Sequence, residues 1–171
     1  MSLLQIAEPN QSATPHAHRY ALGIDLGTTR SLVAVVRSGQ AQVLGEQDND
    51  KLLPSVVYFG ADQTLVGQAA EAMSEQAPEY TVRSIKRFMG RTAADIRFNH
   101  PYQLTGDAGF MPSIVTPQGN KNPVEISALI LRKLYERAAR ALPADSTLQA
   151  VITVPAYFDE AQRQATKDAA V

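Results

Sequence analysis

The chain has 171 residues, a formal net charge of −1 at pH 7, 44% hydrophobic residues and no cysteine. The near-neutral charge offers no bulk attraction to nucleic acid or to an anionic membrane, and the lack of cysteine excludes disulfides, thiolate metal sites and cysteine nucleophiles. The apolar runs are far shorter than the ~20 residues that span a bilayer, so we expect a globular protein of the cytoplasm.

Residues 1–19 show no hydrophobic periodicity, which predicts an irregular arm. They have neither a basic start nor a long apolar centre, so they lack the pattern of a signal peptide. From residue 20 to residue 44 the pattern predicts three short strands, with turns at residues 27–29 and 38–40.

The first of these turns is the candidate functional site. Asp25 ends an apolar strand, and Gly27, Thr28 and Thr29 follow it before a second apolar run. Glycine allows close backbone approach, successive backbone N–H groups form an anion-binding concavity, and threonine hydroxyls add donors. The turn can therefore hold a nucleotide phosphate, while Asp25 would face the accompanying Mg²⁺ through water. The alternative from the residues alone is an ordinary hairpin turn whose aspartate bonds the local backbone.

In the middle of the chain the sequence pattern predicts short strands and short helices. Strands are expected at residues 55–59 and near 64–66, helices at 68–76 and 81–89, and turns with short strands from 91 to 120. Pro78 would stop the first of these helices, and Gly90 would take the left-handed conformation after the second.

The clearest helix follows Asn122, because Pro123 suits its first position and Glu125 completes a capping box. Its predicted buried face, at helical spacing, comprises Leu131, Leu134, Tyr135, Ala138 and Leu142. A buried central strand at residues 150–155 and a helix at 159–170 come next. Along the chain, strands are followed by a mixed insertion and then by a helix, a strand and a helix. This order predicts an α/β layered fold.

Several blocks of the sequence resemble one family. Residues 23–29 read Gly-Ile-Asp-Leu-Gly-Thr-Thr and resemble the first phosphate loop of the actin-like ATPases. Residues 151–158, Val-Ile-Thr-Val-Pro-Ala-Tyr-Phe, and the helix after them resemble the DnaK-type heat-shock chaperones almost letter for letter. Residues 53–57 and 84–91 are also typical of that family. Within it, the first residues and residues 122–124 are most similar to the HscA type, which serves iron–sulfur cluster assembly.

The resemblance implies an actin-like (ribonuclease H-like) ATPase lobe with a mixed sheet and helices. Residues 20–53 and 124–171 would form a partial first subdomain, and residues 54–123 an inserted small α+β subdomain. The rest of the ATPase domain and the peptide-binding domain would be absent, so the chain would be an incomplete domain.

The resemblance also assigns roles to single residues. The residues that would bind ATP or ADP with Mg²⁺ are Asp25, Gly27, Thr28 and Thr29. Lys86 would be the catalytic residue, reaching the transferred phosphate and the attacking water, and Pro155 and Arg163 would form an allosteric relay toward the peptide-binding domain. Arg30 departs from the asparagine usual in the family, and would either pair with a phosphate or crowd the turn.

A full-length parent of this kind would use ATP hydrolysis to grip and release a client, an iron–sulfur scaffold protein, with a J-domain co-chaperone. The 171-residue chain alone would have negligible ATPase activity, because phosphoryl transfer depends on several positioned groups at once, and it would self-associate through its unpaired lobe face. Two alternatives remain at this point: another actin-like ATPase such as a sugar kinase, and a non-catalytic structural fragment.

Overall fold

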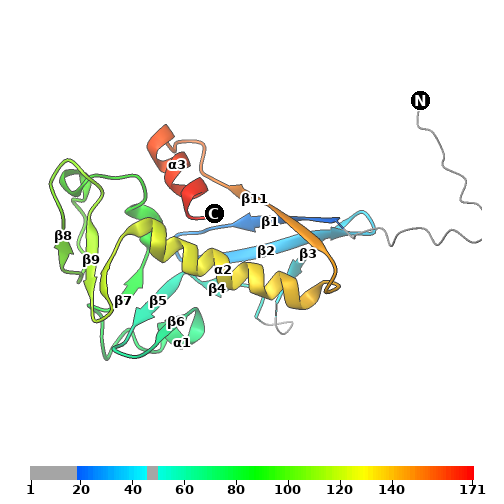
Figure 1. Ribbon diagram of the computed structural model, residues 1–171, viewed down its shortest axis with the longest axis horizontal. Coiled ribbons are helices and arrows are strands. Elements are labelled where there is room, and N and C mark those ends of the chain that lie inside the picture. The colour runs from blue at the N-terminus through cyan, green and yellow to red at the C-terminus, as the bar shows by residue number, and fades with distance from the viewer. Residues whose placement is uncertain (1–18, 46–49) are drawn as a thin grey trace, which may run out of the picture.

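The computed structural model describes residues 19–45 and 50–171, so the expected arm at residues 1–19 lies almost wholly outside the described residues. A five-stranded mixed sheet forms one half of the fold (Figure 1). Its main path runs β11-β1-β2-β3, built from β1 (Arg19–Asp25), β2 (Arg30–Arg37), β3 (Gln40–Leu44) and β11 (Thr147–Thr153), with β4 (Leu53–Pro54) paired to β2. β11 runs parallel to β1, whereas β1, β2 and β3 are antiparallel.

The three strands expected between residues 20 and 44 are therefore confirmed. The hairpin between β2 and β3 turns through Ser38 (φ 49°) and Gly39 (φ 76°). Two consecutive positive φ angles are what a two-residue hairpin needs to match the twist of its strands.

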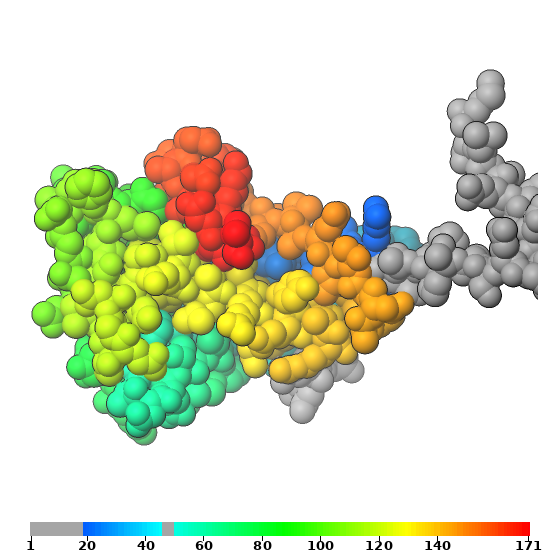
Figure 2. Space-filling view, viewed as in Figure 1, coloured from blue at the N-terminus to red at the C-terminus, as the bar shows by residue number. Residues whose placement is uncertain are grey.

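The long helix α2 (Pro123–Ala141) crosses the face of this sheet (Figures 1 and 2). The expected capping box is present: the Glu125 N–H donates to the Asn122 side chain at 2.9 Å, and the Asn122 N–H donates to Glu125 Oε2 at 2.8 Å. The helix therefore begins where the sequence predicts.

The predicted buried face of this helix is wrong at one position, since Tyr135 is 47% exposed. The fully buried stripe runs through Ile126, Ile130, Leu134 and Ala138, and one residue after Leu134 lies about 100° around the helix. Tyr135 therefore lines a hollow of about 400 Å³ with Ile24, Ile152 and other residues between α2, β1, β11 and the last helix. In Figure 2 the blue of β1 is visible at this hollow.

Two small three-stranded sheets form the other end of the molecule (Figure 1). One has the order β6-β5-β7, from β5 (Val56–Phe59), β6 (Thr64–Val66) and β7 (Thr81–Arg83); the other has the order β10-β9-β8, from β8 (Leu104–Thr105), β9 (Ser113–Thr116) and β10 (Gly119–Lys121). The helix α1 (Gln68–Glu71) and the short 3-10 helices η1 (Ile85–Arg87) and η2 (Ala93–Asp95) complete it. Among the residues that the structure describes, one apolar core cluster draws side chains from both ends of the fold.

Two predicted helices in this part are corrected. The helix expected at residues 68–76 ends at Glu71, because Met73 and Ser74 donate to carbonyls three residues back, which tightens the chain into turns. The helix expected at residues 81–89 is instead strand β7 followed by η1. The β-branched Thr81 and Val82 are buried against β5, and the positive φ of Ser84 (54°) separates the two elements.

The strand expected at residues 150–155 also differs. β11 spans Thr147–Thr153 and was predicted to be buried in the middle of a sheet, yet Val151 is 65% exposed. Among the described residues β11 pairs with β1 alone and so lies at the sheet edge. The final helix α3 (Glu160–Asp168) confirms its prediction and has its own capping box between Asp159 and Gln162.

The α/β prediction, with a mixed sheet and helices, is thus confirmed. The proposed division at residues 53/54 and 123/124 stays a prediction. Within the described ranges, no helix has the length and apolarity needed to cross a membrane.

Candidate functional site

The turn between β1 and β2, here called the Gly-Thr-Thr turn (Gly27, Thr28 and Thr29), is held by three hydrogen bonds. The Gly27 N–H donates to Ser31 Oγ at 3.1 Å, and Ser31 Oγ bonds Ser55 Oγ at 2.8 Å. The Ser55 N–H donates to the Thr29 carbonyl at 2.9 Å. The side chains of Thr28 and Thr29 remain exposed. The hydrogen bonds therefore fix the turn from its buried side and leave its threonine side open to solvent.

Glycine is required at the first position of the turn for steric reasons. A Cβ atom on Gly27 would lie 1.9 Å from the carbonyl oxygen of Arg30. The backbone of the turn therefore folds back on itself more closely than any residue with a side chain allows.

Asp25 lies exposed at the carboxyl end of β1, opposite Thr153 on the parallel strand β11. Thr153 Oγ1 donates to Asp25 Oδ1 at 3.3 Å. In the part of the chain that the structure describes, no cluster of three or more histidine, aspartate or glutamate side chains could enclose a metal ion. A single exposed carboxylate next to the Gly-Thr-Thr turn nevertheless suits Mg²⁺, which takes few protein carboxylates and fills its shell with water and phosphate oxygens.

Lys86 lies in η1, and the fold brings it to the same place as Asp25. Burial lowers the pKa of Lys86, and the nearby carboxylate of Asp25 opposes this in part. The ammonium group also lies 5.5 Å from the centroid of the Phe158 ring. Sequence reasoning did not single out Phe158, which is buried and supplies an apolar wall to this lysine.

A cavity of about 410 Å³ opens beside these residues. Its lining includes Thr28 from the turn and Lys86 from η1, together with Phe158 and Gln162 from the end of the chain. Gly90 (φ 64°) makes this arrangement possible, because a Cβ atom there would lie 2.6 Å from the backbone nitrogen of Gln162.

Of the two predicted relay residues, Pro155 lies at the turn before α3, and Arg163 lies in α3 and contacts that turn. The Phe158 N–H donates to the Pro155 carbonyl at 3.1 Å. Arg163 Nε donates to the Phe158 carbonyl at 3.0 Å, and its guanidinium also bonds the Ala156 carbonyl at 3.3 Å. Arg163 therefore fixes the turn that carries Phe158, the neighbour of Lys86.

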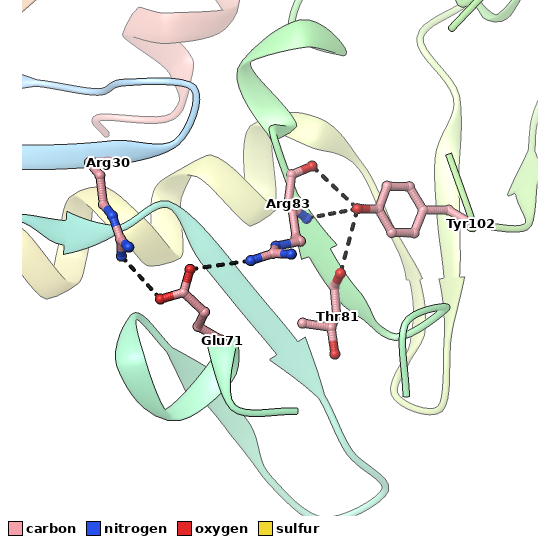
Figure 3. A network of polar contacts seen from close by, with 5 residues as sticks. All are labelled: Arg30, Glu71, Thr81, Arg83 and Tyr102. Carbon is pink, nitrogen blue, oxygen red and sulfur yellow. Dashed lines mark hydrogen bonds and ion pairs between the residues drawn. The ribbon is translucent and has the colours of Figure 1, made fainter. Parts of the chain in front are cut away.

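The side chain of Arg30 forms an ion pair (Figure 3). Its guanidinium donates to Glu71 Oε2 at 3.1 Å, and the other oxygen of Glu71 accepts from Arg83 at 3.2 Å. The backbone N–H of Arg83 in turn donates to the Tyr102 hydroxyl at 2.8 Å. Burial raises the pKa of Tyr102. We call Arg30, Glu71 and Arg83 the arginine–glutamate bridge; it links the strand after the Gly-Thr-Thr turn to the strand before Lys86.

Residues 21–171 match the family described as Hsp70 protein. The chain belongs to the Hsp70 family. It is 56% identical over 170 residues to the chaperone protein HscA homolog of Acinetobacter baumannii strain AYE, covering 99% of this chain and 27% of that protein. It is likewise 56% identical over 174 residues to the chaperone protein HscA homolog of Shewanella denitrificans, covering 99% and 28%.

The Hsp70 match confirms the family resemblance of the sequence and decides against the sugar-kinase alternative. This Hsp70 chain spans about a quarter of the length of the curated relatives it matches. The structure brings together Asp25, Thr28 and Lys86, which the sequence had suggested, on one side of the fold. Glu71 and Phe158 were missed, since an isolated glutamate or phenylalanine carries no local signal.

Proposed function

We propose that this Hsp70 chain forms one wall of a Mg·ATP site. The backbone N–H groups and hydroxyls of Gly27, Thr28 and Thr29 would bind the phosphates. Asp25 would face Mg²⁺ through water. The observation that supports this most is the approach of Lys86 to Asp25 beside a cavity that Thr28 also lines.

Lys86 would act on the transferred phosphoryl group. Its ammonium charge would stabilise the negative charge on the phosphoryl oxygens and orient the attacking water. Burial lowers the pKa of Lys86 because the charged ammonium group is incompletely solvated there. A phosphate next to this group would stabilise its charged form.

For the whole protein, we propose ATP hydrolysis that drives client binding and release, that is, an ATP-dependent molecular chaperone. We further propose a role in iron–sulfur cluster assembly, with a scaffold protein as client and a J-domain co-chaperone as partner, as the resemblance to the HscA type implies. The name of the relatives, chaperone protein HscA homolog, supports the HscA assignment. Pro155 and Arg163 would pass the state of the nucleotide to the peptide-binding domain. We place this protein in the cytoplasm, with no nucleic acid or membrane partner.

The 171-residue chain by itself is expected to bind nucleotide weakly and to hydrolyse it negligibly. Phosphoryl transfer needs reacting groups held on all sides, and this chain supplies only one wall. The exposed outer face of β11, where Val151 is 65% exposed, supports self-association of the chain through this part of its surface.

The test is calorimetric titration of Mg·ATP into the chain and into an Asp25→Ala variant, with Asp62→Ala as the matched control. Asp62 is an exposed turn aspartate outside the site. Binding heat that is lost in Asp25→Ala and kept in Asp62→Ala would support the proposal. Equal heat from all three proteins would contradict the role of Asp25. No heat from any of them would favour the remaining alternative, a non-catalytic structural half-site.

A further inference from the structure

The cavity beside Lys86 has an excess of positive charge. Four cationic side chains line it, Lys86, Arg87, Arg91 and Arg97, against a single carboxylate, Asp95. Only Lys86 and Thr28 belong to the proposed nucleotide site; the three arginines extend beyond it and have no role in that proposal.

These cations have no close ion-pair partner in the part of the chain that the structure describes, although Asp95 lies near enough to interact with Arg91 and Arg97. Within residues 19–45 and 50–171, none of the four cations forms an ion pair within 4.0 Å. Asp95 instead accepts from the Thr92 hydroxyl at 2.7 Å and from the Thr92 N–H at 3.3 Å. These hydrogen bonds, and then the charges of Arg91 and Arg97, lower the pKa of Asp95, so the carboxylate already has its own donors.

The cavity wall is also held in place. The guanidinium of Arg87 lies 3.9 Å from the centroid of the Phe98 ring, a distance at which a cation and an aromatic face attract. Phe98 packs edge-on against the buried Phe88, with ring centroids 4.9 Å apart. Arg87 is therefore positioned before any ligand arrives, which reduces the entropy cost of binding an anion.

From this geometry we propose that the three arginines bind inorganic phosphate, the product of the reaction, as it leaves the position beside Lys86. Guanidinium groups match the oxygens of an oxyanion with paired hydrogen bonds. Several cations with one carboxylate suit a dianion better than a neutral or cationic ligand. The cavity also holds more than one phosphate-sized group, so hydrated phosphate can enter it without closure of the fold.

The proposal rests on the proposed ATPase function for the source of the phosphate. In that reaction a water oxygen bonds to the terminal phosphorus while the bond to the bridging oxygen breaks. The bridging oxygen leaves with ADP, the phosphate keeps the water oxygen, and one proton passes to solvent. The freed phosphate then carries about two negative charges, and Lys86 and Arg87, adjacent in the chain, lead it from the turn to Arg91 and Arg97.

The experiment measures binding of inorganic phosphate and, separately, of Mg·ATP to the 171-residue chain by equilibrium dialysis. The test variant is Arg91→Ala with Arg97→Ala, two exposed side chains outside the nucleotide turn. The control removes two charges from the exposed surface of α2, Arg132→Ala with Arg140→Ala. Because each lost charge-assisted bond is worth about a tenfold change in affinity, phosphate affinity should fall at least tenfold in the test variant. It should change less than about twofold in the control, because Arg132 and Arg140 do not line this cavity and salt screens exposed charges that lie outside a site.

Mg·ATP affinity should remain nearly unchanged in the test variant. Three results would overturn the inference: no phosphate binding to the unmodified chain, equal phosphate affinity in the test variant, or an equal loss in the control. Failure of the nucleotide proposal is separate, because it would show as absent Mg·ATP binding whatever phosphate does.

Discussion

The Gly-Thr-Thr turn makes a sharp prediction for Gly27→Ala. The new Cβ would lie 1.9 Å from the Arg30 carbonyl oxygen, whereas real Cβ atoms essentially never come within 3.0 Å, so the backbone must move by roughly 1 Å. That movement strains the bond from Gly27 to Ser31 and the bond from Ser55 to Thr29.

The magnitude follows from two costs. Overpacking a site of this kind costs about 1–3 kcal/mol, and one lost hydrogen bond adds about 1 kcal/mol. At about 2–4 °C per kcal/mol for a chain of this size, Tm should fall by roughly 4–16 °C. Mg·ATP affinity should also fall about tenfold or more, because the anion-binding N–H groups are displaced.

Thermal unfolding followed by circular dichroism measures the first effect, and the calorimetric titration measures the second. The matched control is Gly109→Ala, since nothing lies within 4 Å of a Cβ atom at that exposed position. Its Tm should stay within about 2 °C of the parent chain, as for ordinary surface substitutions. The steric reasoning is refuted if Gly27→Ala unfolds at the same temperature as Gly109→Ala.

Two further predictions concern stability. The Arg137 side chain is 3% exposed, donates to the Asp50 carbonyl at 2.9 Å and pairs with Asp50 Oδ2 at 3.1 Å. Arg137→Met should therefore lower the free energy of unfolding in urea by about 2–3 kcal/mol. A decrease of less than about 1 kcal/mol would show that the pair is dispensable. Tyr102→Phe removes the acceptor of the Arg83 N–H and should cost about 1–2 kcal/mol at pH 7. Because burial raises the pKa of Tyr102, its stability contribution is complete below its unfolded value of 10.0 and is lost as the pH rises through the folded value. Urea midpoints above pH 10 should therefore fall less steeply in Tyr102→Phe than in the parent chain, and parallel curves would contradict this.

Local features were predictable because their partners are close in sequence. The capping box of α2 joins Asn122 to Glu125, three residues apart, so its residue types alone mark the helix start. The hairpin through Ser38 and Gly39 is read in the same way. The turn pattern already indicated Asp25, and the family blocks added Lys86. Spacing alone would not have linked these two residues.

Errors arose where distant partners override local preference. Thr81 and Val82 look like the start of a short helix, yet pairing with β5 and burial of Val82 make them a strand. β11 has the composition of a buried strand, and its position at the sheet edge follows from which strands pair with it.

The sequence by itself thus determined the caps, the hairpin, the Gly-Thr-Thr turn and the Hsp70 family, because each is encoded within a few neighbouring residues or in whole matching blocks. Only the tertiary structure decided that Lys86 meets Asp25, that Arg30 pairs with Glu71 41 residues away, and that three further arginines share the cavity beside them. These contacts depend on how α2 packs against the main sheet on one side and against η1 on the other. Packing is a property of the whole apolar core, which no local stretch of sequence specifies.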